Sequence, residues 1–345
     1  MVVPGAAGQT SELAPGHFSV STGWRYVYSN QYYLGPHINH QLNNVTKPVR
    51  WWNTLDATVS YQATKRVNVS VTLPFAINLE KFNAPGNGNP LEFRQVIPAR
   101  AFSDTLIMAR TWIRDPEVHR KQNFLVGLGV KLPTGNFHET AVYGNYAGLD
   151  RMRKPIPIAI MPGDGGVDIL GEILGYRSVN FPVRKSQVFA YANYLVTPRD
   201  TTGVSSIIAT EQNTAFVNPA NVRAGALVNT VPDSYAIRSG YIFPIPHTEK
   251  NSWLKGLQCL IGYRFEGSPR HDLIGGSQGY RKPGYFMAIE PGIFYRNKYG
   301  LLTVSGPISF LKNAYADIAQ QHGSGDPRTT TFTQAALNLR YTYYF

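Results

Sequence analysis

The sequence predicts an all-β protein, a closed antiparallel transmembrane β-barrel of about 12 strands with short turns at one end and long loops at the other. Three observations support this fold class. The C-terminal stretch alternates between apolar and polar residues, similar segments recur along the chain, and the connections between them alternate between short and long. Because successive side chains of a strand point to opposite faces, each predicted strand has one apolar and one polar face.

The composition fits a barrel that meets lipid outside and water inside. The chain has 345 residues, of which 43% are hydrophobic and 16% are charged. No run of about 18 uncharged apolar residues is present, so we expect no transmembrane helix. The mean hydropathy is slightly negative, at -0.22. A low average is expected when outward apolar residues alternate with polar residues of the lumen.

The formal net charge of +12 comes from Lys and Arg residues that are scattered along the chain. Nucleic acid binding usually requires a dense basic run or helix, so we expect no nucleic acid partner. Anionic lipid head groups or anionic solutes suit a scattered pattern better. The single cysteine, Cys259, cannot form a disulfide within the chain. We expect no metal site and no cofactor.

The N-terminal part of the chain divides into a lead-in and the start of the barrel. The segment Gln9–Gly16 is polar and contains Pro and Gly, and we expect residues 1–16 to form a lead-in that could plug the lumen. Residues 17–345 form the predicted barrel. The first strand alternates from Phe18 to Ser29, and a long polar loop, Tyr33–Arg50, follows it.

The second and third strands read as a clear hairpin around the tight turn Ala63–Arg66. A loop rich in Asn, Pro and Gly is predicted over Glu80–Ala101, and a further long connection is predicted over Pro133–Gly166. The remaining strands are predicted at Ser103–Ile113, Phe124–Leu132, Val167–Ser178, Gln187–Val196, Tyr235–Phe243, Gly256–Phe265, Tyr285–Tyr295, Leu301–Leu311 and Thr333–Phe345.

The last strand is the strongest single signal for a membrane barrel. It is long enough to cross a bilayer obliquely, which takes roughly 9–11 residues, and it ends on an aromatic residue. The alternative is the last strand of a soluble sandwich, but a sandwich gives no reason for short and long connections to alternate. We expect the barrel-closing strand to face lipid with Leu337, Leu339, Tyr341, Tyr343 and Phe345.

Four segments resemble a family of outer-membrane barrels named for the meta-pathway of phenol degradation. They are Gly127–Gly135 (GLGVKLPTG), Pro162–Asp168 (PGDGGVD), Ala288–Tyr295 (AIEPGIFY) and Val304–Ile308 (VSGPI), in matching order. The resemblance covers strands four to twelve. It implies a barrel of about 12 strands and uptake of hydrophobic or aromatic compounds, and it supplies no catalytic residue.

This interpretation places the chain in the bacterial outer membrane, with short periplasmic turns and long extracellular loops. Because no secretory signal is visible at Met1, we expect that a signal peptide has been removed. The expected partners are outer-membrane lipid and LPS, the barrel-assembly machinery through the C-terminal strand, and envelope proteins.

Six charged residues fall on the polar faces of the predicted strands, and five of them are basic. Basic rings inside a pore favour anions, but the same side chains could pair with carboxylates and hold the barrel rigid. Both interpretations stay open from the sequence. The candidates for lining the lumen are Arg25, Asp56, Lys131, Arg238, Arg264 and Arg340.

The segment Gly275–Gly279 (GGSQG) matches the nucleophile-elbow pattern around Ser277, with His271 and Asp272 just upstream. That chemistry needs a strand-to-helix turn in an α/β sheet, and no helix pattern follows here. We therefore expect a loop and no enzyme activity. The predicted function is passive passage of small hydrophobic, aromatic or anionic solutes. The alternative is a structural anchor barrel with a plugged lumen in a larger outer-membrane assembly.

Overall fold

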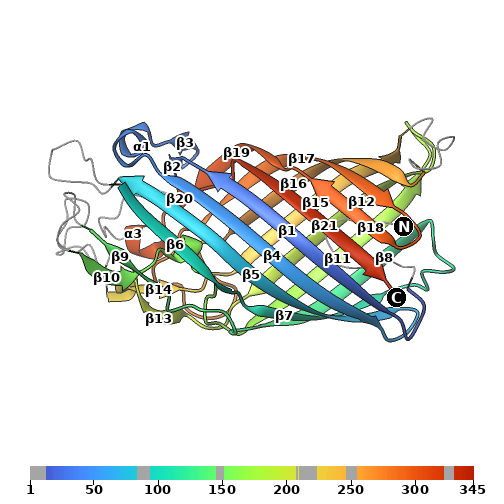
Figure 1. Cartoon of the computed structure of the whole chain (residues 1–345), viewed down its shortest axis with the longest axis horizontal. Coiled ribbons are helices and arrows are strands. Elements are labelled where there is room, and N and C mark those ends of the chain that lie inside the picture. The colour runs from blue at the N-terminus through green and yellow to red at the C-terminus, as the bar shows by residue number, and fades with distance from the viewer. Residues whose placement is uncertain are drawn as a thin grey trace.

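The computed structural model describes residues 13–83, 94–144, 151–206, 209, 224–245, 255–321 and 330–345. Its main feature is one large antiparallel sheet whose first and last strands join (Figure 1). The sheet contains β1 (Phe18–Ser29), β4 (Val49–Gln62), β5 (Val67–Asn83), β6 (Arg94–Phe102), β7 (Thr105–Trp112), β8 (Gln122–Leu132), β11 (Asp168–Val179), β12 (Ser186–Val196), β15 (Ser234–Pro244), β16 (Leu257–Ser268), β17 (Gly284–Arg296), β18 (Gly300–Ser305), β19 (Ile308–Ala314) and β21 (Ala335–Tyr344).

These 14 strands close a barrel with twelve strands around its wall. Two wall strands are interrupted, so that β6 with β7 and β18 with β19 each count as one. The second interruption falls at Gly306–Pro307, where proline supplies no N–H for the strand ladder. The barrel closes where β1 pairs with β21, from Ser19 opposite Tyr344 to Tyr28 opposite Ala335. The predicted fold class and strand number are confirmed.

The two ends of the barrel differ as predicted. The end where β1 starts and β21 finishes carries the short turns, and the other end carries the long connections (Figure 1). The turn Ala63–Arg66 shows why a short connection suffices, since the hydroxyl of Thr64 accepts hydrogen bonds from the backbone N–H groups of Arg66 and Val67. We call these ends the short-turn end and the long-loop end.

The long connections fold over the barrel as small elements of their own (Figure 1). The helix α1 begins after Asn39, whose side chain accepts a hydrogen bond from the N–H of Leu42, which is a typical helix N-cap. The elements at this end are β2 (Tyr32–Leu34), β3 (His37–Ile38), α1 (His40–Thr46), β9 (Thr140–Tyr143), β10 (Met152–Pro155), η1 (Ile158–Ile160), β13 (Thr201–Ser205), η3 (Ala224–Leu227), β14 (Val228–Thr230), α3 (Ile318–Gln321) and β20 (Thr330–Thr331).

Two predicted loops are corrected by the structure. The segment Glu80–Ala101 was expected to be a loop, but β5 continues to Asn83 and β6 pairs with it over Arg94–Phe102. Pro98 and the neighbouring Asn and Gly residues hide the alternation of this extended hairpin. The segment Tyr33–Arg50 is likewise more than a loop, because it contains β3, α1 and the start of β4.

The outer surface of the barrel is apolar. Large hydrophobic side chains alternate outward on the wall strands, for example Val69, Val71 and Leu73 on β5. Five side chains were predicted to face lipid, and they are 36–63% exposed: Leu337, Leu339, Tyr341 and Tyr343 on β21, and Phe345 directly after it. Across the described residues, no helix has both the length and the apolar character to cross a membrane.

Candidate functional site

The middle of the barrel interior is a layer of charged side chains that reach across strands. Arg25 on β1 lies 3.4 Å from Glu266 on β16, although β21, β18 and β17 separate these strands in the sheet. Such a contact requires both side chains to point inward. Arg25 keeps 45% of its side chain exposed, so water reaches this part of the interior.

Two ion pairs bridge strands that are not neighbours by passing over a glycine. Arg340 on β21 lies 2.6 Å from Asp56 on β4, and Gly23 of β1 sits opposite both residues. A Cβ atom at Gly23 would lie 2.8 Å from the Arg340 guanidinium. A second pair, Arg110 on β7 with Glu172 on β11, crosses β8 in the same way.

Gly127 of β8 is opposite both Arg110 and Glu172. A Cβ atom there would lie 2.6 Å from Cγ of Glu172. The pair is buried, with side chains 4% and 1% exposed. Tyr191 donates a hydrogen bond to Glu172 over 3.0 Å, and Arg110 donates to the hydroxyl of Ser70 over 2.7 Å. Both charges therefore have partners on several strands.

Glu290 on β17 is the centre of a third network. It accepts from the guanidinium groups of Arg238 and Arg264 at 2.7 and 2.8 Å and from the hydroxyl of Ser305 at 2.7 Å. Arg264 also pairs with Glu266 at 2.8 Å. This network holds β15, β16, β17 and β18 together from inside the barrel.

Lys131 lies at the long-loop end of β8, inside a group of three carboxylates. It forms ion pairs with Asp104, Asp164 and Asp168, and the distance to Asp104 is 3.5 Å. Asp104 also accepts from the backbone N–H groups of Gly135 and Asp164, at 2.9 and 3.1 Å. The segments Gly127–Gly135 and Pro162–Asp168 therefore meet in space at this cluster.

The short-turn end of the interior is filled by an apolar layer. Its members are buried residues of eight wall strands, close to the short turns, and Tyr344 packs against them. The ring of Trp112 meets the ring of Tyr176 edge to face, with centroids 5.6 Å apart. We call the following set the apolar layer: Trp112, Leu125, Leu174, Tyr176, Phe189, Tyr191, Ile242, Leu260, Phe294 and Leu301.

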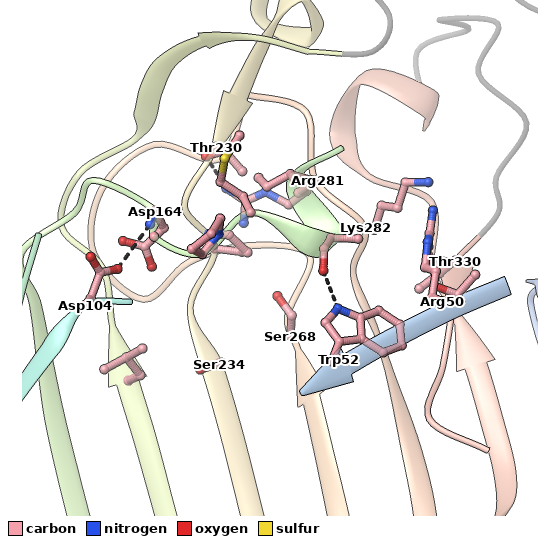
Figure 2. A pocket seen from close by; sticks show the side chains of 18 residues that line it. Arg50, Trp52, Asp104, Asp164, Thr230, Ser234, Ser268, Arg281, Lys282 and Thr330 are labelled. Carbon is pink, nitrogen blue, oxygen red and sulfur yellow. Dashed lines mark hydrogen bonds between the residues drawn. The ribbon is translucent and has the colours of Figure 1, made fainter. Parts of the chain in front are cut away.

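The long-loop end is covered by connections that fold inward, and a cavity of about 400 Å³ lies beneath them. Figure 2 shows Asp104 and Asp164 on one side of this cavity and Arg50, Trp52 and Lys282 on the other, with the tops of the wall strands below. We call this cavity the mouth cavity. Its apolar walls are Trp52, Ile158, Met161, Pro162, Leu195 and Pro232.

The walls of the mouth cavity are held by contacts between distant segments. Trp52 donates its indole N–H to the carbonyl of Ala159 over 2.6 Å (Figure 2). Arg50 pairs with Glu80 of the neighbouring strand and also donates to Thr331 of β20. The cavity is thus shaped by residues from both halves of the chain.

The loop between β16 and β17 also builds the cover. Arg281 and Asp272 form an ion pair at 2.6 Å with both side chains fully buried. Ser277 is part of this arrangement, since its hydroxyl accepts from the N–H of Asp272 over 2.9 Å. His271 is exposed and makes no contact with Ser277 among the described hydrogen bonds. Ser277 therefore lies in a loop, as the sequence predicted, and it packs against a structural ion pair.

Beside this cover, Tyr33 packs edge to face on Phe332, with ring centroids 5.8 Å apart. Burial raises the pKa of the Tyr33 hydroxyl above its ordinary value, and that hydroxyl donates to Gln31 over 2.9 Å. These contacts attach β2 to the segment before β21. Across the described ranges, no group of three His, Cys, Asp or Glu residues is arranged to hold a metal ion.

All six sequence-predicted lumen residues point into the barrel, and each one forms an ion pair: Arg25, Asp56, Lys131, Arg238, Arg264 and Arg340. Sequence reasoning missed several other charged residues of the interior. Glu172, Glu266 and Glu290 share the polar parity of their strands, so alternation alone could have placed them inside. Arg110 was harder to place because both faces of its strand carry apolar residues. The predicted plug at residues 1–16 stays a prediction, since residues 1–12 lie outside the described part of the chain.

The fold matches solved outer-membrane barrels. An outer membrane channel from Pseudomonas putida F1 aligns with a TM-score of 0.56 and 14% identity, over 100% of this chain and 100% of that chain. The translocator domain of the autotransporter NalP from Neisseria meningitidis gives 0.45 and 9% identity, over 97% and 90% of the two chains. A FadL homologue from Pseudomonas aeruginosa gives 0.42 and 9% identity, over 95% and 90%.

No family model and no curated protein matches the chain. Membership of the phenol-degradation family therefore stays a prediction. The match with the Pseudomonas putida channel extends over the whole of both chains, but at 14% identity a likeness of this kind carries the fold alone. The chain has the fold of an outer-membrane channel barrel.

Proposed function

We propose that the protein is an outer-membrane channel that passes small organic solutes of partly aromatic or apolar character. The observation that carries this proposal is the mouth cavity together with the apolar layer behind it. A cavity of about 400 Å³ is within the range of small-molecule sites, about 300–1,000 Å³. It combines apolar walls with charged groups at both sides, which suits a solute with an apolar body and a polar end.

The apolar layer favours the passage of solutes that are not purely hydrophilic. Hydrophobic constrictions oppose water and hydrated ions because the narrow space dewets. A small amphipathic solute loses less hydration free energy than a hydrated ion on entering such a layer, because its apolar part replaces contacts between the side chains. Passage through the layer requires these side chains to move, and release sideways into the bilayer is the other route.

A swelling assay with proteoliposomes tests this function. Phenyl glucoside and glucose share a sugar ring, but phenyl glucoside is larger and carries an aromatic group. We expect phenyl glucoside to enter faster than glucose. A water-filled pore would give the reverse order, because it sorts solutes by size, and that order would overturn the proposed solute class.

A variant of the apolar layer tests the constriction itself. Trp112→Ala with Phe294→Ala removes two buried aromatic rings from the layer, and we expect it to raise glucose entry at least several-fold. Tyr263→Ala with Phe310→Ala is the matched control. The centroids of these two rings lie 6.5 Å apart, and neither ring belongs to the apolar layer. Folding of each variant is checked by its faster migration on gels before heating.

The second candidate is a structural barrel with a plugged lumen, and the apolar layer also favours it. The same assay separates the two functions. If the unmodified protein admits neither solute above the level of protein-free vesicles while the opened variant admits both, the layer is a permanent plug. The proposed channel function would then be withdrawn in favour of an anchoring role.

A further inference from the structure

The short-turn end of the barrel is strongly basic. Among its described turn and strand-end residues, eleven side chains are basic and two, Asp115 and Glu117, are acidic. The charged middle layer of the interior is made of ion pairs, so this rim carries much of the net charge of +12. The basic residues are Lys65, Arg66, Arg114, Arg120, Lys121, Arg177, Arg184, Lys185, Lys255, Arg296 and Lys298.

One part of this rim forms a pocket. The turn between β7 and β8 and the end of β11 enclose a space of about 530 Å³, lined by Val118, His119, Arg120, Lys121, Gln122, Arg177 and Ser178. The two segments are fixed to each other, because Ser178 donates its N–H to the carbonyl of Lys121 over 2.6 Å and Gln122 is opposite Arg177 in the ladder.

The cations of this pocket have no acidic partner in the part of the chain that the structure describes. No carboxylate among the described residues forms an ion pair with Arg120, Lys121 or Arg177. Of the two nearby acids, Glu117 pairs with Lys65 at 2.7 Å and Asp115 accepts from the N–H of Glu117 at 2.9 Å. Three positive charges therefore face the pocket.

The pocket opens onto the apolar outer wall. Arg177 and Gln122 are exposed residues on the outward face of their strands. Next to them Phe124 is 64% exposed, and its ring lies over Gly175, where a Cβ atom would come within 2.8 Å of it. Further along the same face Ile173 and Leu128 are 60% and 63% exposed. A polar site thus continues directly into an apolar strip.

We propose that this pocket binds the phosphate of an anionic phospholipid, whose acyl chain lies along Phe124 and Ile173. Guanidinium groups bind phosphate oxygens through paired N–H donors, and a basic cluster at the membrane surface attracts anionic lipids. The proposal rests on the membrane location contained in the proposed function, but it makes no use of transport. The site would fix the depth and rotation of the barrel in the phospholipid leaflet.

Binding of short-chain dihexanoyl phosphatidylglycerol to the purified full chain tests the site. We expect Arg120→Gln, Lys121→Gln and Arg177→Gln together to weaken binding at least tenfold, since the three substitutions remove all the Lys and Arg groups that attract the lipid phosphate to this pocket. The matched control, Arg184→Gln with Lys255→Gln and Lys298→Gln, removes three charges from elsewhere on the rim. It should change binding less than twofold.

Further probes separate the possible sources of the phosphate. Phosphatidylcholine should bind much more weakly than phosphatidylglycerol. Phe124→Ala should weaken the binding of phosphatidylglycerol without changing the binding of glycerol 3-phosphate. If inorganic phosphate or glycerol 3-phosphate binds as tightly as the lipid, the pocket is a site for free phosphate and the lipid proposal is wrong. Equal losses in both triple variants would show a diffuse charged rim, which also overturns it. The transport assay is independent, so either proposal can fail alone.

Discussion

Replacing Glu172 by Gln should strongly destabilise the barrel. The change keeps the size of the side chain and lets Tyr191 keep its hydrogen bond, so its main effect is to leave Arg110 as an unpaired charge. The two side chains are 1% and 4% exposed. Removing one partner of a buried ion pair costs about 3–5 kcal/mol. We expect about 3 kcal/mol, the lower end, because Ser70 still accepts a hydrogen bond from Arg110.

The loss is measured by urea unfolding of the protein in phospholipid vesicles, followed by tryptophan fluorescence. Two variants act as controls. Glu117→Gln breaks the exposed pair with Lys65, and exposed pairs contribute little, so its unfolding curve should match that of the unmodified protein. Arg110→Met with Glu172→Leu removes both charges, and replacing a buried pair by apolar groups is often close to neutral. The double variant should therefore regain at least half of the loss.

Unfolding of Glu172→Gln at the same urea concentration as Glu117→Gln would refute the presence of a buried, unpaired charge on Arg110 in the variant. Such a result would mean that water reaches Arg110 and replaces its partner. The double variant distinguishes a charge defect from a packing defect. A packing defect at position 172 would persist in the double variant, whereas the defect caused by an unpaired charge would be relieved.

Two further predictions concern the wall of the barrel. Gly127→Ala should destabilise the barrel by about 1–3 kcal/mol, as overpacking does, because the new Cβ would meet Glu172. Gly171→Ala is the control, because nothing lies within 4 Å of a Cβ at that position. Equal unfolding curves for the two variants would contradict the crossing of the ion pair over Gly127. Leu339→Arg, near the middle of β21, should cost about 2–4 kcal/mol in vesicles, whereas Tyr343→Arg near the strand end should cost about 0–1 kcal/mol. Equal costs would argue against the depth assigned to this strand, and no cost for either would argue against a lipid-facing surface.

The barrel itself could be predicted because its physics repeats along the chain. A wall strand must place apolar side chains outward at every second position, so alternation marks β1, β8 and β21 without knowledge of their neighbours. Turn residues then mark the ends, as at Ala63–Arg66. Alternation is hidden where turn-forming residues occur inside a strand. Pro98 lies within β6, which among the described strands pairs only with β5, so the edge of β6 that faces away from β5 needs no backbone N–H donor. The proline made the outer half of that hairpin resemble a loop in the sequence.

The partners inside the barrel could not be predicted, because they depend on register. Arg110 meets Glu172 because Gly127 lies opposite both, and a shift by one residue would turn the side chains of a strand to the other face. The cover of the mouth cavity depends even more on contacts between residues that are far apart in the sequence. Arg50 contacts Thr331 across most of the chain, and the loop holding Arg281 and Asp272 has no periodic pattern that would reveal its fold.

The distribution of charge links the structure to its two proposed roles. Inside, each of Arg25, Arg238, Arg264 and Arg340 has a carboxylate partner, so the field in the lumen is far weaker than the count of basic residues suggests. A basic ring can select anions when its charges are free, and these are paired. Arg120, Lys121 and Arg177, which have no carboxylate partner in the described part of the chain, lie on the short-turn rim beside an apolar wall. The two proposals therefore divide the work: net charge acts where the barrel meets lipid head groups, and the shape and apolar surface of the interior select the solutes.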